Sequence, residues 1–157
     1  MRFPPVNPRL WCTLAAVALA AAGCGRPAPA AAGPEAAPAN LDVDAALARA
    51  AVNQFLVLEA RGLPAADTLL APGADFIMTG VRVTTRPRLA GLNGPGEAAI
   101  EESGTGFAGS LAWVVVSYRF TGRSEALNER ARATFVLEKQ RAGWRIRHAH
   151  SSMVERW

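Results

Sequence analysis

The stretch that decides the fold lies near the C-terminus and reads Trp144-Arg145-Ile146-Arg147-His148-Ala149-His150-Ser151-Ser152. Because side chains alternate between the two faces of a β-strand, both histidines are predicted to share a face with Trp144 and Ile146. The two arginines then take the opposite face, which is solvated or ion-paired. An apolar tryptophan and isoleucine mark the first face as the one turned toward a core. Both histidines are therefore expected to point inward, where neutral imidazoles need hydrogen-bond partners.

Strand signals continue upstream of this stretch. Segments rich in β-branched and aromatic residues are separated by Gly-containing turns, and the candidate strands are 75–83 with an interruption at Gly80, 98–104, 111–120, 131–139 and 144–152. Arg82, Arg86 and Arg88 alternate with other residues, as expected of a solvated edge. The last two pairs of strands are expected to form hairpins.

Helix signals precede all of these strands. Asn40 or Asp42 can cap a helix of about five turns. Gly62 supplies its C-terminal stop, and Pro64 can open a short second helix that ends before Pro72. The predicted apolar stripe, which packs on the sheet, consists of Leu47, Ala51, Phe55 and Leu58. Helices followed by hairpins predict an α+β domain with a largely antiparallel sheet.

From about residue 42 to residue 152, the chain resembles the SnoaL-like branch of the nuclear-transport-factor-2-like superfamily. The resemblance rests on the two helices and on four segments, of which the last is the most specific: Asp75-Phe76, 112–118, 132–137 and 143–152. It implies a cone-shaped α+β fold in which a curved antiparallel sheet wraps around the long helix and leaves a cavity at the wide end, commonly in a homodimer. The third helix usual in the family has almost no counterpart here, because residues 88–97 are mostly a Gly/Pro turn.

Candidate residues for the lining of such a cavity are Phe55, Asp75, Trp113, Tyr118, Trp144, His148 and His150. Proton-transfer members of the family need a base and an acid that stabilises an enolate. No pattern around these residues matches a catalytic motif of those enzymes, so no catalytic residue is assigned. The two histidines are open to three interpretations: a core pair, a ligand contact or metal binding. No third metal ligand is evident, and no metal or cofactor is expected.

The N-terminus has the organisation of an export signal. Arg2 and Arg9 precede an apolar run from Leu10 to Ala22, which is too short to span a bilayer, and Gly23-Cys24 follows. Residues 1–23 resemble a bacterial lipoprotein signal peptide, which implies lipid attachment at Cys24. Ordinary secretory cleavage after Ala28-Pro29-Ala30 is the alternative, and it implies release into the periplasm. By resemblance to lipoprotein sorting, Gly25 after the cysteine favours the periplasmic face of an outer membrane.

A tether separates this signal from the domain. Residues 24–40 are mostly Ala, Pro and Gly, which offer little to bury, and the domain is expected to span 41–157. Cys12 leaves with the signal, so the mature chain has no partner for Cys24 in an intramolecular disulfide. The domain must be stable through its core alone.

Charge and motifs argue against nucleic-acid partners. The 17 Lys and Arg residues stand against 13 Asp and Glu residues, and two of the arginines belong to the signal, which leaves 15 against 13, or +2. Such a balance gives no strong positive field. The spacing G-x-G-x-x-G occurs at 104–109, but a β-branched and aromatic run follows it rather than a helix, so we expect a hairpin turn there.

Two functions therefore remain open. The first is a lipid-anchored module of the cell envelope that binds a small apolar molecule or supports a dimer. The second is an envelope enzyme of the polyketide cyclase or ketosteroid isomerase type. The missing catalytic pattern favours the first.

Overall fold

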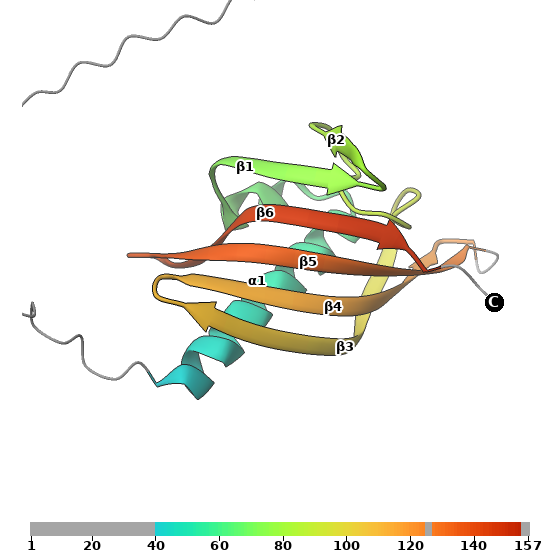
Figure 1. The fold of residues 1–157 in the computed structure, drawn as a ribbon. Helices are drawn as coiled ribbons and strands as arrows, with labels where there is room; N and C mark the ends of the chain where they lie inside the picture. Colours follow the sequence, from blue (N-terminus) through green and yellow to red (C-terminus); the bar gives the residue numbers. More distant parts are fainter. Residues whose placement is uncertain (1–39, 125–126, 155–157) are drawn as a thin grey trace, which may run out of the picture. The chain divides into compact units, whose positions relative to one another are not determined.

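A computed structural model describes residues 40–124 and 127–154 of the chain (Figure 1). A long helix α1 (Leu41–Ala60) and a short 3-10 helix η1 (Pro64–Leu69) come first. The strands follow as β1 (Leu70–Met78), β2 (Val81–Val83), β3 (Gly96–Ala108), β4 (Leu111–Gly122), β5 (Asn128–Gln140) and β6 (Gly143–Met153). The predicted order of helices and strands is confirmed. The predicted signal peptide, Cys24 and the tether up to residue 39 lie outside the described residues.

The strands form one curved sheet with the order β2-β1-β6-β5-β4-β3. All neighbouring pairs are antiparallel except β1 and β6, which run parallel. The expected antiparallel sheet is therefore a mixed sheet with one parallel pair. Helix α1 lies across one face of the sheet, behind it in Figure 1, and packs on β3, β4 and β6. We call this the inner face, and the opposite face the outer face.

Helix α1 begins where the sequence predicts. The side chain of Asn40 accepts a hydrogen bond from the backbone N–H of Val43 at 3.4 Å and so caps the first turn. The predicted apolar stripe is only partly right. Phe55 is fully buried, but Leu47 is 54% exposed, and the helix is buried instead along Asp44, Ala48, Val52, Phe55, Leu56, Glu59 and Ala60. The buried face of the helix is therefore displaced by about one residue from the predicted stripe, with Ala48 and Val52 buried in place of Leu47 and Ala51.

Aromatic rings form the centre of the core. Phe55 of α1 stacks on Phe76 of β1 with ring centroids 5.7 Å apart, and it meets Phe135 of β5 edge-on at 6.1 Å. The hairpin predicted around residues 104–109 is confirmed, but its turn is shorter than predicted, because β3 continues to Ala108 and the turn consists of Gly109 and Ser110. Within the described ranges, no helix is long and apolar enough to cross a membrane.

Candidate functional site

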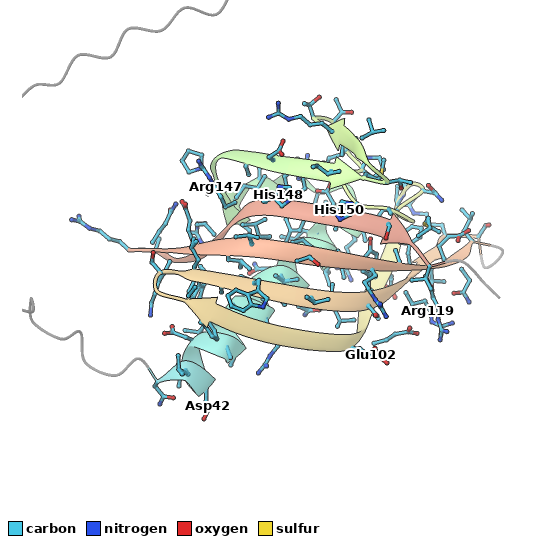
Figure 2. The ribbon with its side chains drawn as sticks, viewed as in Figure 1. Asp42, Glu102, Arg119, Arg147, His148 and His150 are labelled. Carbon is cyan, nitrogen blue, oxygen red and sulfur yellow. The ribbon has the colours of Figure 1, made fainter. Side chains whose placement is uncertain are left out.

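The two histidines lie on the outer face of the sheet, not the inner one. Along β6 the buried residues are Trp144 and Ile146, and then Ala149 and Ser151. The alternation of buried and exposed residues is interrupted because β6 carries one extra residue. Leu137 pairs with Ile146, whereas the adjacent Val136 pairs with His148. This β-bulge at Arg147 moves every later side chain to the opposite face. Figure 2 shows His148 and His150 on the face away from α1. The predicted inward orientation of both histidines is wrong.

Asp75 and His148 are brought together by the parallel pairing of β1 with β6. The Nδ1 atom of His148 lies 3.5 Å from Oδ2 of Asp75, and Nε of Arg82 donates to Oδ1 of the same carboxylate at 2.5 Å. The side chains of Asp75 and His148 are each about one third exposed. Such a pair can orient an imidazole, but it does so at the surface rather than in an enclosed cavity.

An open hollow of about 270 Å³ lies beside this pair, at the edge of β1. It is lined by Leu70, Ala71, Gly73, Ala74, Asp75, Phe76, Arg82, Val83, Thr84 and Arg88. Among the residues that the structure describes, no group of three or more His, Cys, Asp or Glu side chains could hold a metal ion.

The remaining predicted pocket residues are scattered. Phe55 is buried in the core, and Tyr118 is buried on the inner face, where its hydroxyl donates to the carbonyl of Ala90 at 2.6 Å. Trp144 is buried near the start of β6, against Phe107 and beneath the ammonium group of Lys139. Trp113 is 44% exposed on the outer face, as its alternation with buried Ala112 and Val114 requires. The seven candidates therefore do not line one common pocket.

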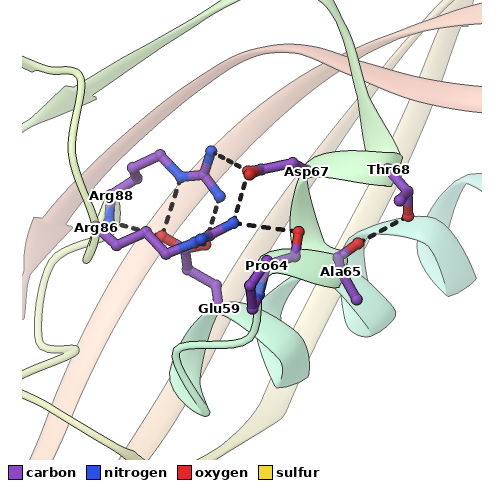
Figure 3. A network of polar contacts seen from close by, with 7 residues as sticks. All are labelled: Glu59, Pro64, Ala65, Asp67, Thr68, Arg86 and Arg88. Atoms are coloured by element: carbon purple, nitrogen blue, oxygen red, sulfur yellow. Dashed lines mark hydrogen bonds and ion pairs between the residues drawn. The ribbon is translucent and has the colours of Figure 1, made fainter.

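A buried ion-pair network was missed by the sequence reasoning (Figure 3). The carboxylate of Glu59, whose side chain is fully buried, accepts hydrogen bonds from Nε and Nη2 of Arg88 at 3.0 and 2.6 Å and from the backbone N–H of Arg88 at 2.9 Å. Arg86 Nε donates to the same carboxylate at 3.2 Å. Arg88 was predicted to be solvated, and this is wrong: it is 7% exposed. Its guanidinium centre lies 5.0 Å from the ring of Phe76, a cation–π contact.

Asp67 of η1 completes this network at its solvent side. Its carboxylate lies 2.8 Å from Nη1 of Arg88 and 2.7 Å from Nη2 of Arg86. Desolvation raises the pKa of Asp67, but the hydrogen bonds and charges of the two arginines outweigh it and hold that pKa below its usual range. Burial lowers the pKa of Arg88, and Glu59 and Asp67 more than offset this effect, so its pKa lies above the usual value.

One sequence signal could have located the network. Glu59 lies four residues after Phe55 and therefore on the same face of the helix. An acid on the apolar face of a helix requires a buried partner, and an arginine is the side chain best suited to it.

The segment 88–92, where the family usually has a third helix, is buried against the inner face of the sheet. Leu89, Ala90 and Leu92 are at most 2% exposed. The backbone of Ala90 is held from both sides, because its carbonyl accepts from Tyr118 and its N–H donates to Oγ of Ser151 at 3.0 Å. This segment therefore covers part of the inner face of the sheet, at the end where Tyr118 and Ser151 lie.

The outer face carries exposed apolar side chains on β4. Leu111, Trp113 and Val115 are 43%, 44% and 37% exposed. The indole of Trp113 lies across Gly106, where any side chain would collide with it. Beside Val115, Gly104 leaves open space, and a second hollow of about 270 Å³ lies there, lined by Glu102, Ser103, Gly104, Val115, Ser117 and Arg132.

Charged side chains border this apolar strip. Glu101 accepts from Arg119 at 2.7 Å and from Arg130 at 3.3 Å, and the hydrogen bond from Arg119 lowers the pKa of Glu101. Figure 2 shows Glu102 and Arg119 at this end of the sheet. Nε of Arg132 donates to Oγ of Ser117 at 3.4 Å. The outer face thus combines an exposed apolar centre with charges of both signs.

We compared the sequence with models of known protein families. A model of the SnoaL-like domain matches residues 67–155, more than half of the chain. The chain belongs to the SnoaL-like family. A comparison with curated proteins found no match.

Solved structures share the fold of this SnoaL-like domain. A nuclear-transport-factor-2-like superfamily protein from Salmonella enterica serovar Typhimurium is 18% identical, with a TM-score of 0.58 over 75% of this chain and 95% of that chain. A ketosteroid isomerase-like protein from Erwinia carotovora atroseptica is 16% identical, with a TM-score of 0.54 over 72% and 98%. A protein with a cystatin-like fold from Novosphingobium aromaticivorans is 12% identical, with a TM-score of 0.57 over 73% and 84%. At these identities the similarity shows the fold alone.

Proposed function

We propose that this SnoaL-like domain is an interaction module that pairs with a second copy of itself through the outer face of its sheet. The observation that carries the proposal is the contrast on β4 between the fully buried inner residues and an exposed apolar strip on the outer face. Three large apolar side chains at 37–44% exposure stand next to one another there. Contiguous apolar surface of this kind marks protein–protein contacts more often than it occurs on free monomers.

The positions of the acid–base candidates give less support to an enzyme of the cyclase or isomerase type. Such a reaction needs a water-excluding pocket that holds the substrate against a base. The predicted acid–base candidates are divided between the surface, where Asp75 meets His148, and the core, where Tyr118 is bonded to Ala90.

We also propose that the domain is exported and anchored to a membrane by a lipid. A basic region, a short apolar run and Gly23-Cys24 support export followed by lipid attachment at Cys24, and the Ala/Pro-rich tether would join the domain to that lipid. The test is labelling with a fatty-acid analogue in a bacterial host. Wild type should be labelled and recovered with membranes, whereas Cys24→Ser should lose both properties. Equal labelling of the two chains would contradict lipidation.

The homodimer is tested by native mass spectrometry of the full chain purified from its host in mild detergent. Wild type should be dimeric. Val115→Asp should be monomeric, because it places a charge within the apolar strip, next to Trp113 on the same face of β4. Leu47→Asp is the matched control, since Leu47 is more exposed than Val115 but lies on α1. A monomeric wild type, or equal disruption by both variants, would overturn the proposal.

A further inference from the structure

We propose that the first half of α1 docks the domain on the surface of a phospholipid membrane. The contact is an apolar stripe formed by Val43, Ala46, Leu47 and Ala50, which we call the α1 stripe. The inference rests on the lipid anchor at Cys24 proposed above and does not depend on the homodimer.

The α1 stripe lies on the side of the helix that faces away from the sheet. Val43 and Leu47 are four residues apart and Ala50 follows three residues later, so their side chains share one side of the helix. Val43 is 52% exposed and Leu47 is 54% exposed. The helical repeat of 3.6 residues places this side almost opposite to Ala48 and Val52, which are buried on the sheet.

This apolar exposed side is confined to the first half of α1. In the second half, the exposed positions are taken by polar residues, Asn53 and Gln54. The exposed side of a helix on a globular domain normally carries polar or charged residues, and a helix that is apolar on all sides is normally buried. The sheet covers one side of this half of α1, and the α1 stripe therefore indicates a second cover.

The position of the α1 stripe in the chain points to a membrane as that cover. Helix α1 starts at Leu41, directly after the tether, and residues 25–40 separate it from Cys24. A chain of that length reaches at most about 55 Å even when fully extended. A lipid on Cys24 would therefore keep the α1 stripe at a high effective concentration near the membrane, where a weak contact is enough to dock the domain.

The shape and the area of the α1 stripe fit lipid better than a second protein. Residues 43–50 span about 12 Å along a helix that is about 10 Å wide, which gives roughly 120 Å². A standard protein interface buries about 800 Å² per partner. The side of a helix is also convex, and the headgroup region of a bilayer admits a convex apolar ridge without a matching groove.

The charges around the α1 stripe leave the apolar contact dominant. Arg49 of α1 and Arg141 of the turn between β5 and β6 are exposed and can approach anionic headgroups, whereas exposed Asp42 opposes them. The ammonium group of Lys139 is bonded to the carboxylate of Asp44 at 2.8 Å. The small balance of charge predicts that docking depends little on salt concentration.

Docking through α1 is compatible with pairing through the sheet. Helix α1 covers the inner face, so a membrane against the α1 stripe leaves the outer face open to a second copy (Figure 1). The two contacts can therefore be broken one at a time.

Fluorescence quenching in vesicles tests the docking. The full lipidated chain is purified in mild detergent and reconstituted into vesicles of phosphatidylethanolamine and phosphatidylglycerol. An environment-sensitive fluorophore is attached through Ala50→Cys in one sample and through Arg123→Cys in another, because Arg123 follows β4 at the end opposite to the start of α1. Lipids with a quencher on their acyl chains should quench the fluorophore at position 50 strongly and the one at position 123 weakly.

A pair of charged variants assigns the contact to the α1 stripe. Leu47→Asp in the Ala50→Cys chain should shift the docking equilibrium at least about tenfold toward the free domain, because it removes a half-exposed leucine and places a charge in the contact. Val115→Asp is the matched control, since it places the same charge on the outer face, and it should retain the quenching. Far-ultraviolet circular dichroism should show that both variants are folded.

Each contrary outcome overturns the docking. Equal quenching at positions 50 and 123 would mean that no face of the domain is preferred. A blue-shifted fluorophore at position 50 that acyl-chain quenchers do not reach would mean that protein covers the α1 stripe, either the tether or a second copy. Loss of quenching at high salt would mean adsorption through Arg49 and Arg141 instead.

The docking and the proposals on which it rests can fail separately. A chain that is labelled by the fatty-acid analogue and recovered with membranes, but whose fluorophore at position 50 is not quenched, keeps the anchor and overturns the docking. Equal labelling of wild type and Cys24→Ser overturns both the anchor and the docking. A monomeric wild type that is quenched at position 50 overturns the homodimer and keeps the docking.

Discussion

The two faces of the sheet are built from the same strands but in opposite ways. On β4, the inner residues Ala112, Val114, Val116, Tyr118 and Phe120 are at most 1% exposed. The outer residues between them include an exposed leucine, tryptophan and valine, followed by polar side chains toward the end of the strand. The inner face is thus fully used in holding the domain together. The outer face has apolar surface that the monomer does not use, which is why function is better sought there.

The most destructive change should be one on the inner side. Phe55→Ala removes a ring that packs on two others and should cost about 3–5 kcal/mol of the free energy of unfolding. Leu47→Ala, on the exposed side of the same helix, should cost no more than about 0.5 kcal/mol. Urea denaturation followed by circular dichroism measures both. Equal losses would show that the helix face is assigned incorrectly.

The buried ion pair should come next. Arg88→Met leaves the carboxylate of Glu59 in the core with only Arg86 as its charged partner, and should cost about 2–4 kcal/mol. The double variant Glu59→Gln with Arg88→Met should recover part of that loss, because no buried charge is then left behind. Urea denaturation of all three chains gives the coupling between the two sites. Strictly additive losses would mean that the pair does not interact.

Much of this fold follows from local patterns. The cap at Asn40, the stops after the helix and the alternation along β4 each depend on neighbouring residues alone, and each is found in the structure. The resemblance to the SnoaL-like family likewise predicted an α+β fold with a curved sheet, which the structure has, although one pair of strands is parallel.

What could not be predicted depends on contacts distant in the sequence. At the bulge the register of β6 is interrupted against both neighbours, β5 and β1, and Nη1 of Arg147 donates to the carbonyl of Pro72 there. A prediction that assumes strict alternation along one strand cannot locate such a bulge. Similarly, Arg88 looks like a surface residue until Glu59, 29 positions earlier, is placed beside it.

Alkaline titration should reveal how firmly the inner face is closed. Tyr118 is the single tyrosine of the chain, so its ionisation is read directly from ultraviolet absorbance. Burial raises the pKa of Tyr118 well above its usual value near 10. The folded state therefore favours the neutral phenol: its contribution to stability is constant below pH 10 and falls as the pH rises above that, by up to about 1.4 kcal/mol per pH unit. Ionisation near pH 10 in the folded protein would mean that water reaches the ring.

The variant Tyr118→Phe leaves the carbonyl of Ala90 without its donor. It should lack the absorbance step, and its free energy of unfolding should be lower by about 1–2 kcal/mol.

The smallest change in the free energy of unfolding is expected for substitutions of the two histidines. This prediction tests most directly which face of the sheet they occupy. If they were core residues, replacing either would strand a buried hydrogen-bond partner and cost about 1–3 kcal/mol. On the outer face, His150 is exposed and His148 is half-buried beside Asp75, so His150→Gln and His148→Gln should each change the free energy of unfolding by less than about 0.5 kcal/mol. The matched control from the same strand is Ser151→Val, because Ser151 is buried and its Oγ accepts from the N–H of Ala90.

Urea denaturation should show a clear loss in the free energy of unfolding for this control only. Since a dimer can mask such differences through its own stability, the comparison is made in the Val115→Asp background, where the outer face is not covered by a second copy. A loss at His150 as large as that at Ser151 would place the imidazole inside and contradict the bulge.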